Sequence, residues 1–166
     1  MAAGPVLIAY DGSDLAEHAV REAAAVLAQR RVLVVCVWEE GMALIVEPTA
    51  IDPGGGVSPI VAPIDMRAAA EIDDTLADRA RRIAQHGAEI ARQLGFDAEG
   101  LAVADEPGAS IAKTLVQLAT ERDAPAIVVG AHGHGRLAKL LGSTSRDVLH
   151  HSTRPVLVVR KQPDEH

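Results

Sequence analysis

The chain has 166 residues, one cysteine, a formal net charge of −7 and an aromatic content of only 2%. This length fits one domain, residues 1–166, and the acidic, aromatic-poor composition lacks the basic face and stacking rings of a nucleic-acid-binding protein. No apolar run approaches the ~20 residues of a membrane span, and no basic residue precedes the short apolar segment at the amino terminus. We therefore expect a cytoplasmic protein that neither binds nucleic acid nor enters a membrane.

Short runs rich in Val, Ile and Leu predict the strands. Four of them are nearly continuous, as in parallel strands that are covered on both faces. These four runs are residues 5–10, 32–38, 126–130 and 155–159. A further run, residues 96–103, is interrupted by glycine and acidic residues, which is typical of a strand at a sheet edge. Cys36 lies within the second run, where we expect a buried and inert thiol.

Segments with a helical spacing of apolar residues lie between these runs. Residues 15–26 predict a first helix, residues 72–94 a long second helix and residues 111–118 a third. Strands that alternate with helices are joined by right-handed crossovers, which build a parallel sheet. The sequence therefore predicts an α/β fold: an open, doubly wound, parallel five-stranded sheet with helices on both faces.

Several residues predict where the helices begin and end. Asp14 and Glu17 have the spacing of a capping box at the start of the first helix, and Pro107 suits the first turn of the third helix. Gly95 is expected to end the long second helix.

Residues 40–64 do not fit this alternation of strands and helices. They are rich in proline and glycine and show no sustained period. A long loop of this kind inside a domain is functional or disordered, and we predict a flexible insertion or mobile flap in preference to an ordered lid. Residues 161–166 are expected to form a frayed tail.

Two predicted strands end in segments that suit a ligand. The first ends in Tyr10-Asp11-Gly12-Ser13, and the fourth ends in the glycine loop Gly130-Ala131-His132-Gly133-His134-Gly135, with Gly142-Ser143-Thr144 at a later helix start. Glycines let the backbone approach a ligand, and the first amides of a helix attract phosphate. Open α/β sheets bind ligands where the strand order reverses, so we expect Asp11 and Gly130 to face each other across such a crevice.

The order of these motifs resembles the universal stress protein family of nucleotide-binding α/β proteins. The resemblance covers residues 6–13, residues 34–40 and residues 124–159, which close on Arg154-Pro155-Val156-Leu157-Val158-Val159. It implies a Rossmann-like sheet with strand order 3-2-1-4-5, a homodimer formed through the last strand, Pro155 to Val159, and binding of ATP with Mg²⁺. An exposed apolar edge strand independently favours such pairing.

The resemblance also implies a set of nucleotide-binding residues. Asp11 would contact the adenosine part, Val37 would line the adenine pocket, and the glycine-rich segments would surround the ribose and phosphates. The full set is Ala9, Tyr10, Asp11, Val37, Gly130, His132, Gly133, His134, Gly142, Ser143 and Thr144. One departure is visible: eight residues separate Gly133 from Gly142, whereas ATP-binding members usually have nine.

Structural interpretations of these residues stay open at this point. One alternative is that Asp11 serves solely as a helix cap and does not contact a ligand. In the same way, Gly130 and Gly133 could serve solely as turn glycines. His132 and His134 are spaced like metal ligands but have no acid or cysteine nearby in the sequence, so we expect no metal.

The leading hypothesis for function is a stress-response regulator or sensor that binds ATP or a related adenine nucleotide. Two alternatives remain: a nucleotide-free interaction module of the same fold, and a slow ATP hydrolase in which His132 or His134 positions water. The sequence holds no evident nucleophile and base pair, so no catalytic residue is assigned.

Overall fold

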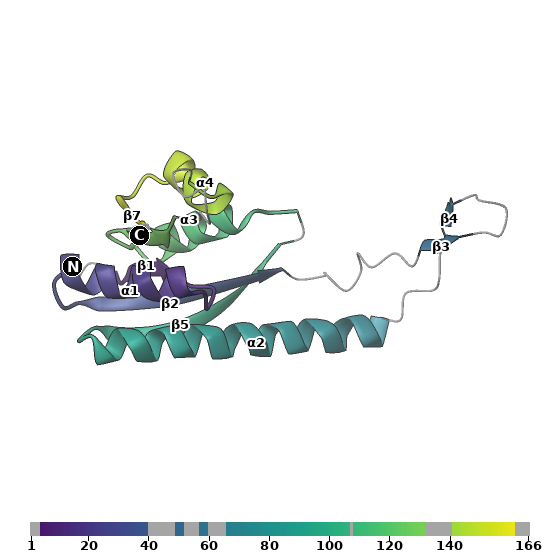
Figure 1. The fold of residues 1–166 in the computed structure, drawn as a ribbon, viewed down its shortest axis with the longest axis horizontal. Coiled ribbons are helices and arrows are strands. Elements are labelled where there is room, and N and C mark those ends of the chain that lie inside the picture. Colours follow the sequence, from purple (N-terminus) through teal and green to yellow (C-terminus); the bar gives the residue numbers. More distant parts are fainter. Residues whose placement is uncertain are drawn as a thin grey trace, which may run out of the picture.

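The computed structural model describes residues 4–39, 49–51, 57–59, 66–106, 108–131 and 141–161. Five strands form one parallel sheet with the order β5-β2-β1-β6-β7 (Figure 1). The strands are β1 (Val6–Ala9), β2 (Arg31–Glu39), β5 (Asp97–Asp105), β6 (Ile127–Gly130) and β7 (Val156–Val159). Numbered along the chain, these five strands have the predicted order 3-2-1-4-5, so the predicted fold is confirmed.

The strands in the middle of the sheet are those whose sequences are continuously apolar. Val6, Leu7 and Ile8 of β1 are fully buried, because helices cover both faces of the sheet and alternate side chains reach opposite faces. β5 lies at one edge, as its interrupted sequence predicts, and β7 lies at the other.

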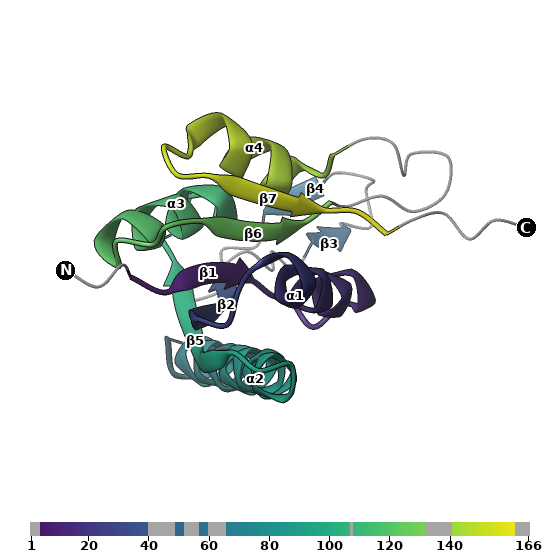
Figure 2. The same cartoon turned by 90° about the vertical axis from the view of Figure 1, so that its left-hand side faces the viewer.

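Two helices cover each face of the sheet. Val6 and Ile8 pack in one core with residues of α1 (Asp14–Val26) and α2 (Met66–Gln93). Leu7 packs in a second core with residues of α3 (Ile111–Glu121) and α4 (Ser143–His151). Figure 2 shows α1 and α2 on one side of the sheet and α3 and α4 on the other.

The structure corrects two predicted helix starts. Ser13, rather than Asp14, is the N-cap of α1: its backbone is extended and its Oγ accepts a hydrogen bond from the Ala16 amide at 3.1 Å. α3 begins at Ile111 with Ser110 as its N-cap, because the chain at Gly108 has a φ of +82°, which is not helical.

The predicted end of the long helix is confirmed. Gly95 has a φ of +94° and donates its N–H to the Arg92 carbonyl, while Phe96 donates to the Ala91 carbonyl. A residue in this left-handed conformation commonly ends a helix, and glycine adopts it without strain.

Within residues 40–64, the structure describes two short strands, β3 (Thr49–Ile51) and β4 (Val57–Pro59), which pair antiparallel. The other residues of this segment, and residues 162–166 of the tail, lie outside the described residues, so the predicted flexibility stays a prediction. Among the described helices, none combines the length and apolarity that a membrane crossing requires.

Candidate functional site

A pocket lies at the carboxyl ends of three neighbouring strands, β2, β1 and β6, and is closed by α1, α3 and α4. Its volume of about 120 Å³ is roughly ten times what a single ordered water requires, so it accommodates part of a small organic molecule. The lining residues are Ala9, Tyr10, Asp11, Ser13, Leu15, Ala16, Val35, Val37, Ile111, Leu115, Val129, Gly130, Thr144 and Ser145. β1 stands between β2 and β6, so the pocket lies where the strand order reverses.

The structure brings many of the predicted site residues together. The predicted residues that line the pocket are Ala9, Tyr10, Asp11, Val37, Gly130 and Thr144. Gly142 and Ser143 stand at the start of α4, next to Thr144, without lining the pocket themselves. His132, Gly133 and His134 lie outside the described residues.

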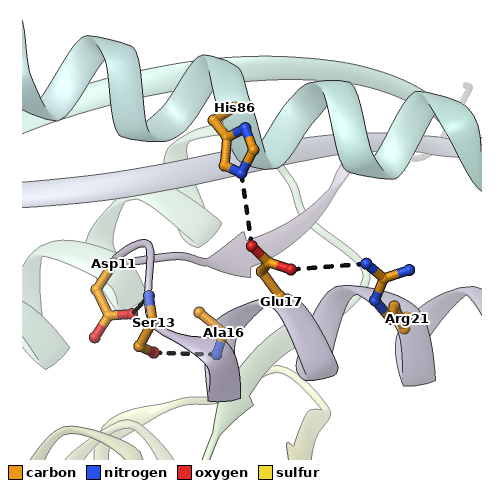
Figure 3. A network of polar contacts seen from close by, with 6 residues as sticks. All are labelled: Asp11, Ser13, Ala16, Glu17, Arg21 and His86. Carbon is orange, nitrogen blue, oxygen red and sulfur yellow. Dashed lines mark hydrogen bonds and ion pairs between the residues drawn. The ribbon is translucent and has the colours of Figure 1, made fainter.

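The turn after β1 is ordered by its own side chains (Figure 3). Asp11 Oδ1 accepts a hydrogen bond from the Ser13 amide at 2.9 Å, and Gly12 between them has a φ of +80°. Ser13 in turn caps α1. Asp11 is therefore not the helix cap, and its carboxylate has a second oxygen with no hydrogen-bond partner among the described residues.

The lack of a side chain at Gly130 suits a close approach to Leu15 and not a left-handed backbone conformation. Its φ is outside the left-handed region, but a Cβ placed on it would lie 3.0 Å from Leu15 Cγ and 3.3 Å from Leu15 Cδ2. Because both residues line the pocket, this approach sets the distance between the end of β6 and the start of α1.

The start of α4 lies beside the pocket and has no side-chain cap among the described residues. Gly142 is the N-cap and has no side chain to accept from the first turn. The Ser145 hydroxyl donates to the Gly142 carbonyl at 3.1 Å, and in the described part of the chain the amides of Ser143 and Thr144 have no hydrogen-bond acceptor. Such amides at the positive end of the helix dipole form an anion-binding position.

The opposite wall of the pocket is apolar. Val35 and Val37 come from β2, Val129 from β6, and Ile111 and Leu115 from α3. A flat, weakly polar group such as a nucleobase suits these walls. Alternation along β2 predicts Val35 once Val37 is assigned, but no local signal in the sequence identified the two α3 residues.

Tyr10 connects the pocket to the other face of the sheet. Tyr10 directly follows β1, and its ring packs in the core on the side of α2, where a Cβ on Gly87 would lie 2.7 Å from Tyr10 Cδ1. The phenol oxygen is buried and has no hydrogen-bond partner among the described residues. Burial, followed by the charges of Glu17 and Asp11, raises the pKa of Tyr10 to about 12.

A polar contact joins α1 to α2 beside this ring. Glu17 lies 3.6 Å from His86 Nε2 and 3.6 Å from Arg21 Nη2 (Figure 3).

On the same face of the sheet, burial raises the pKa of the Cys36 thiol to about 11, with a smaller contribution from the charge of Asp11. The expected buried thiol is confirmed. Within the described ranges, no cluster of His, Cys, Asp or Glu is arranged to hold a metal ion.

Known proteins share this fold across their whole length. A universal stress protein from Archaeoglobus fulgidus is 27% identical, with a TM-score of 0.61 and 96% of both chains covered. A structure from the same organism in complex with dAMP is 25% identical, with a TM-score of 0.57, covering 96% of this chain and 100% of that one. A family member from Burkholderia pseudomallei is 22% identical, with a TM-score of 0.58, covering 95% and 96% of the two chains.

A family model confirms the resemblance found in the sequence. The model described as "Universal stress protein family" matches residues 57–160, which is more than half of the chain. The match includes β5, β6, β7 and the helices α3 and α4 that wall the pocket. The chain therefore belongs to the universal stress protein family.

Proposed function

We propose that the pocket binds adenine nucleotides, with ATP as the cellular ligand, and that the protein acts as a nucleotide-dependent regulator or sensor in a stress response. The observation that carries this proposal is the arrangement of three kinds of surface around one pocket. Apolar walls, the Asp11 carboxylate and the uncapped start of α4 meet at the switch point of the sheet.

Each surface suits one part of an adenine nucleotide. Val37 and Leu115 would pack against the base, and the second oxygen of Asp11 would accept a hydrogen bond from a ribose hydroxyl or from the adenine amine. The phosphates would lie toward the amides of Ser143 and Thr144, where the helix dipole favours negative charge. Magnesium would travel with the phosphates and keep most of its waters.

The comparison with the Archaeoglobus fulgidus protein supports the same class of ligand. That protein is in complex with dAMP and aligns over 96% of this chain. Because dAMP has a single phosphate, that complex supports only the adenine part of the proposal. The proposed preference for a triphosphate is based on the backbone amides at the start of α4, which would bind further phosphates.

Isothermal titration calorimetry with ATP and AMP, with and without Mg²⁺, tests the proposal. The informative variant is Asp11→Asn, because the amide oxygen still accepts the Ser13 N–H and keeps the turn. The variant removes one negative charge from the protein, and this long-range effect alone would strengthen the binding of an anionic nucleotide. If the variant instead binds about tenfold more weakly or worse, Asp11 makes a direct contact with the nucleotide.

Asp14→Asn is the matched control. Asp14 is exposed, lies three residues away and does not line the pocket, yet its substitution changes the net charge by the same amount. We expect the control to bind as the wild type does. Absence of heat with millimolar ATP and AMP in the folded wild-type protein would refute nucleotide binding.

Mass spectrometry of denatured, freshly purified protein separates this proposal from a nucleotide-free interaction module. We expect adenine nucleotide to be released in a stoichiometric amount. If the protein releases no nucleotide and also binds none in the titration, it acts as a nucleotide-free interaction module.

We further propose that two copies pair through β7. The Ile127 amide donates to the Pro155 carbonyl and the Ala131 amide to the Val159 carbonyl, so alternate residues of β7 face β6. The backbone groups of Val156 and Val158 therefore point to the open edge of the sheet. Unpaired groups of this kind at an apolar edge favour pairing with another strand.

Light scattering coupled to size-exclusion chromatography tests the dimer. We expect the wild type to have twice the mass of one chain. Val158→Pro removes an N–H that faces away from β6 and is expected to give a folded monomer. A wild-type monomer, or a Val158→Pro variant that remains fully dimeric, would exclude pairing through β7.

A further inference from the structure

Asp105 is the only carboxylate that is buried among the described side chains, with 2% of its surface exposed. It is the last residue of β5 and accepts a hydrogen bond from the Thr114 hydroxyl on α3. Burial of a charged carboxylate is costly unless hydrogen bonds compensate for the lost water. The Thr114 hydroxyl is its hydrogen-bond partner in the described part of the chain.

The Asp105–Thr114 pair joins elements whose neighbouring residues belong to the pocket walls. Thr114 is adjacent to Leu115 and one turn from Ile111, the two α3 residues that line the pocket. On the sheet side, Asp105 is two residues from Val103, which pairs in register with Val37 of the facing wall. The pair therefore joins the strand that supports Val37 to the helix that carries Ile111 and Leu115.

The other hydrogen bonds at the start of α3 among the described residues do not reach the sheet. Ser110 accepts from the Lys113 amide through its side chain and from the Thr114 amide through its carbonyl, and both bonds are local. The far end of α3 is held independently, because Leu118 and Ala119 are buried in the core. The start of α3 also packs in this core through Ala112 and Leu115. Loss of the Thr114 hydroxyl therefore removes the polar contact that fixes the first turn against β5, while the apolar packing of the helix remains.

We propose that Asp105 and Thr114 are positioning residues that set the width of the nucleotide pocket without touching the ligand. This inference rests on the proposed function. The hydrogen bond holds Ile111 and Leu115 at a fixed distance from Val37, so the pocket is shaped before the base arrives. Preorganisation of this kind raises affinity because less ordering is left for the binding step.

The test compares AMP affinity in Thr114→Val and Thr114→Ser by titration calorimetry. Valine keeps the shape of threonine but has no hydroxyl, whereas serine keeps the hydroxyl. We expect the valine variant to bind AMP about tenfold more weakly and the serine variant to stay within about threefold of the wild type. All measurements are made where circular dichroism shows each variant to be folded.

Thr120→Val is the matched control on the same helix. Thr120 is exposed, and its hydroxyl donates to the Val116 carbonyl within α3, so it does not reach the sheet. Its variant is expected to bind AMP as the wild type does. A second readout is the methyl NMR signal of Ile111 in the free protein, which should shift in Thr114→Val and stay unchanged in Thr114→Ser and Thr120→Val.

Thr114→Val leaves the buried Asp105 carboxylate without its partner, which could prevent folding. In that case the double variant Asp105→Ala/Thr114→Val, which removes both partners, is tested in place of the single variant. The double variant is also expected to lose about tenfold in affinity. AMP affinity equal to that of the wild type in a folded variant without the hydroxyl overturns the inference, and so does an equal loss in Thr114→Ser. If the wild type binds neither AMP nor ATP, the proposed function fails and this inference fails with it.

Discussion

Gly130 at the end of β6 and Leu15 in the first turn of α1 approach so closely that a methyl group on Gly130 would lie 3.0 Å from Leu15 Cγ. Gly130 is not in the left-handed region, so its lack of a side chain serves this contact and the adjoining pocket. The space between the two residues is therefore a determinant of the width of the site.

Gly130→Ala is expected to weaken AMP binding by about tenfold while changing the free energy of unfolding by less than about 1 kcal/mol. Leu15 is only partly buried, so it can move by the few tenths of an ångström that the new methyl group requires. Because Leu15 lines the pocket, its displacement is expected to narrow the pocket. Calorimetry and urea denaturation measure the two quantities. The double variant Gly130→Ala/Leu15→Ala removes the crowded Cγ and should regain affinity, and a double variant as weak as the single one would contradict this explanation.

Gly12→Ala is expected to destabilise the protein by about 1–2 kcal/mol through backbone strain. The residue has a φ of +80°, and the nearest atom to an added Cβ is Ile83 Cγ2 at 3.5 Å, which is an ordinary contact. Gly12→Asn is the control, because asparagine tolerates this conformation better than alanine. Urea denaturation should rank the wild type first, asparagine second and alanine last. Equal stability of the alanine variant and the wild type would show that the turn does not depend on this conformation.

Tyr10→Phe is expected to be at least as stable as the wild type near neutral pH, with a gain of about 1 kcal/mol. The phenol oxygen of Tyr10 is buried without a hydrogen-bond partner among the described residues, so its removal relieves an unfavourable burial. Thermal and urea denaturation measure the difference. A clear loss of stability in the phenylalanine variant would show that this oxygen is hydrogen-bonded in solution.

The same residue predicts a dependence of stability on alkaline pH. The pKa of Tyr10 is about 12 in the folded protein against 10.0 for the free side chain, so the folded state holds the proton more tightly. This contribution to stability is complete below pH 10 and is lost as the pH rises through about 12. Relative to Tyr10→Phe, the wild type should lose up to about 2–3 kcal/mol over this range. Because Tyr10 is the only tyrosine, phenolate absorbance reports its ionisation directly. A midpoint near 10 in the folded protein would contradict the burial of the phenol.

Cys36 is expected to react slowly with a thiol reagent near neutral pH as long as the protein is folded. Its pKa is raised to about 11 by burial, so the reactive thiolate is scarce as well as covered. Labelling with Ellman's reagent, in buffer and in denaturing urea, measures the effect. Labelling at the same rate in both solutions would show that the thiol is accessible.

The strands and the polar half of the site follow from signals that are local in the sequence, whereas the strand order was implied by the resemblance to the family. Continuous apolar runs mark the central strands, and Asp11 and Gly130 stand where such runs end. The start of α1 was predicted one residue too late, because the Asp11 carboxylate holds the Ser13 amide and leaves Ser13 as the cap. Local spacing alone does not reveal that contact.

The apolar half of the site was not predictable in the same way. Ile111 and Leu115 belong to a stripe that any core-facing helix shows, and only the packing of α3 over β2 places them at the pocket. The Asp105–Thr114 pair also joins two elements that the sequence treats separately. Such contacts depend on how helices sit on the sheet, which tertiary packing decides.

A crystal structure of the protein grown with ATP and Mg²⁺ would show directly whether and where the nucleotide binds. We expect the adenine between Val37 and Leu115, a ribose or adenine contact with Asp11, and phosphates at the amides of Ser143 and Thr144. A pocket that stays empty at saturating ATP, or a nucleotide bound away from these residues, would contradict the proposal.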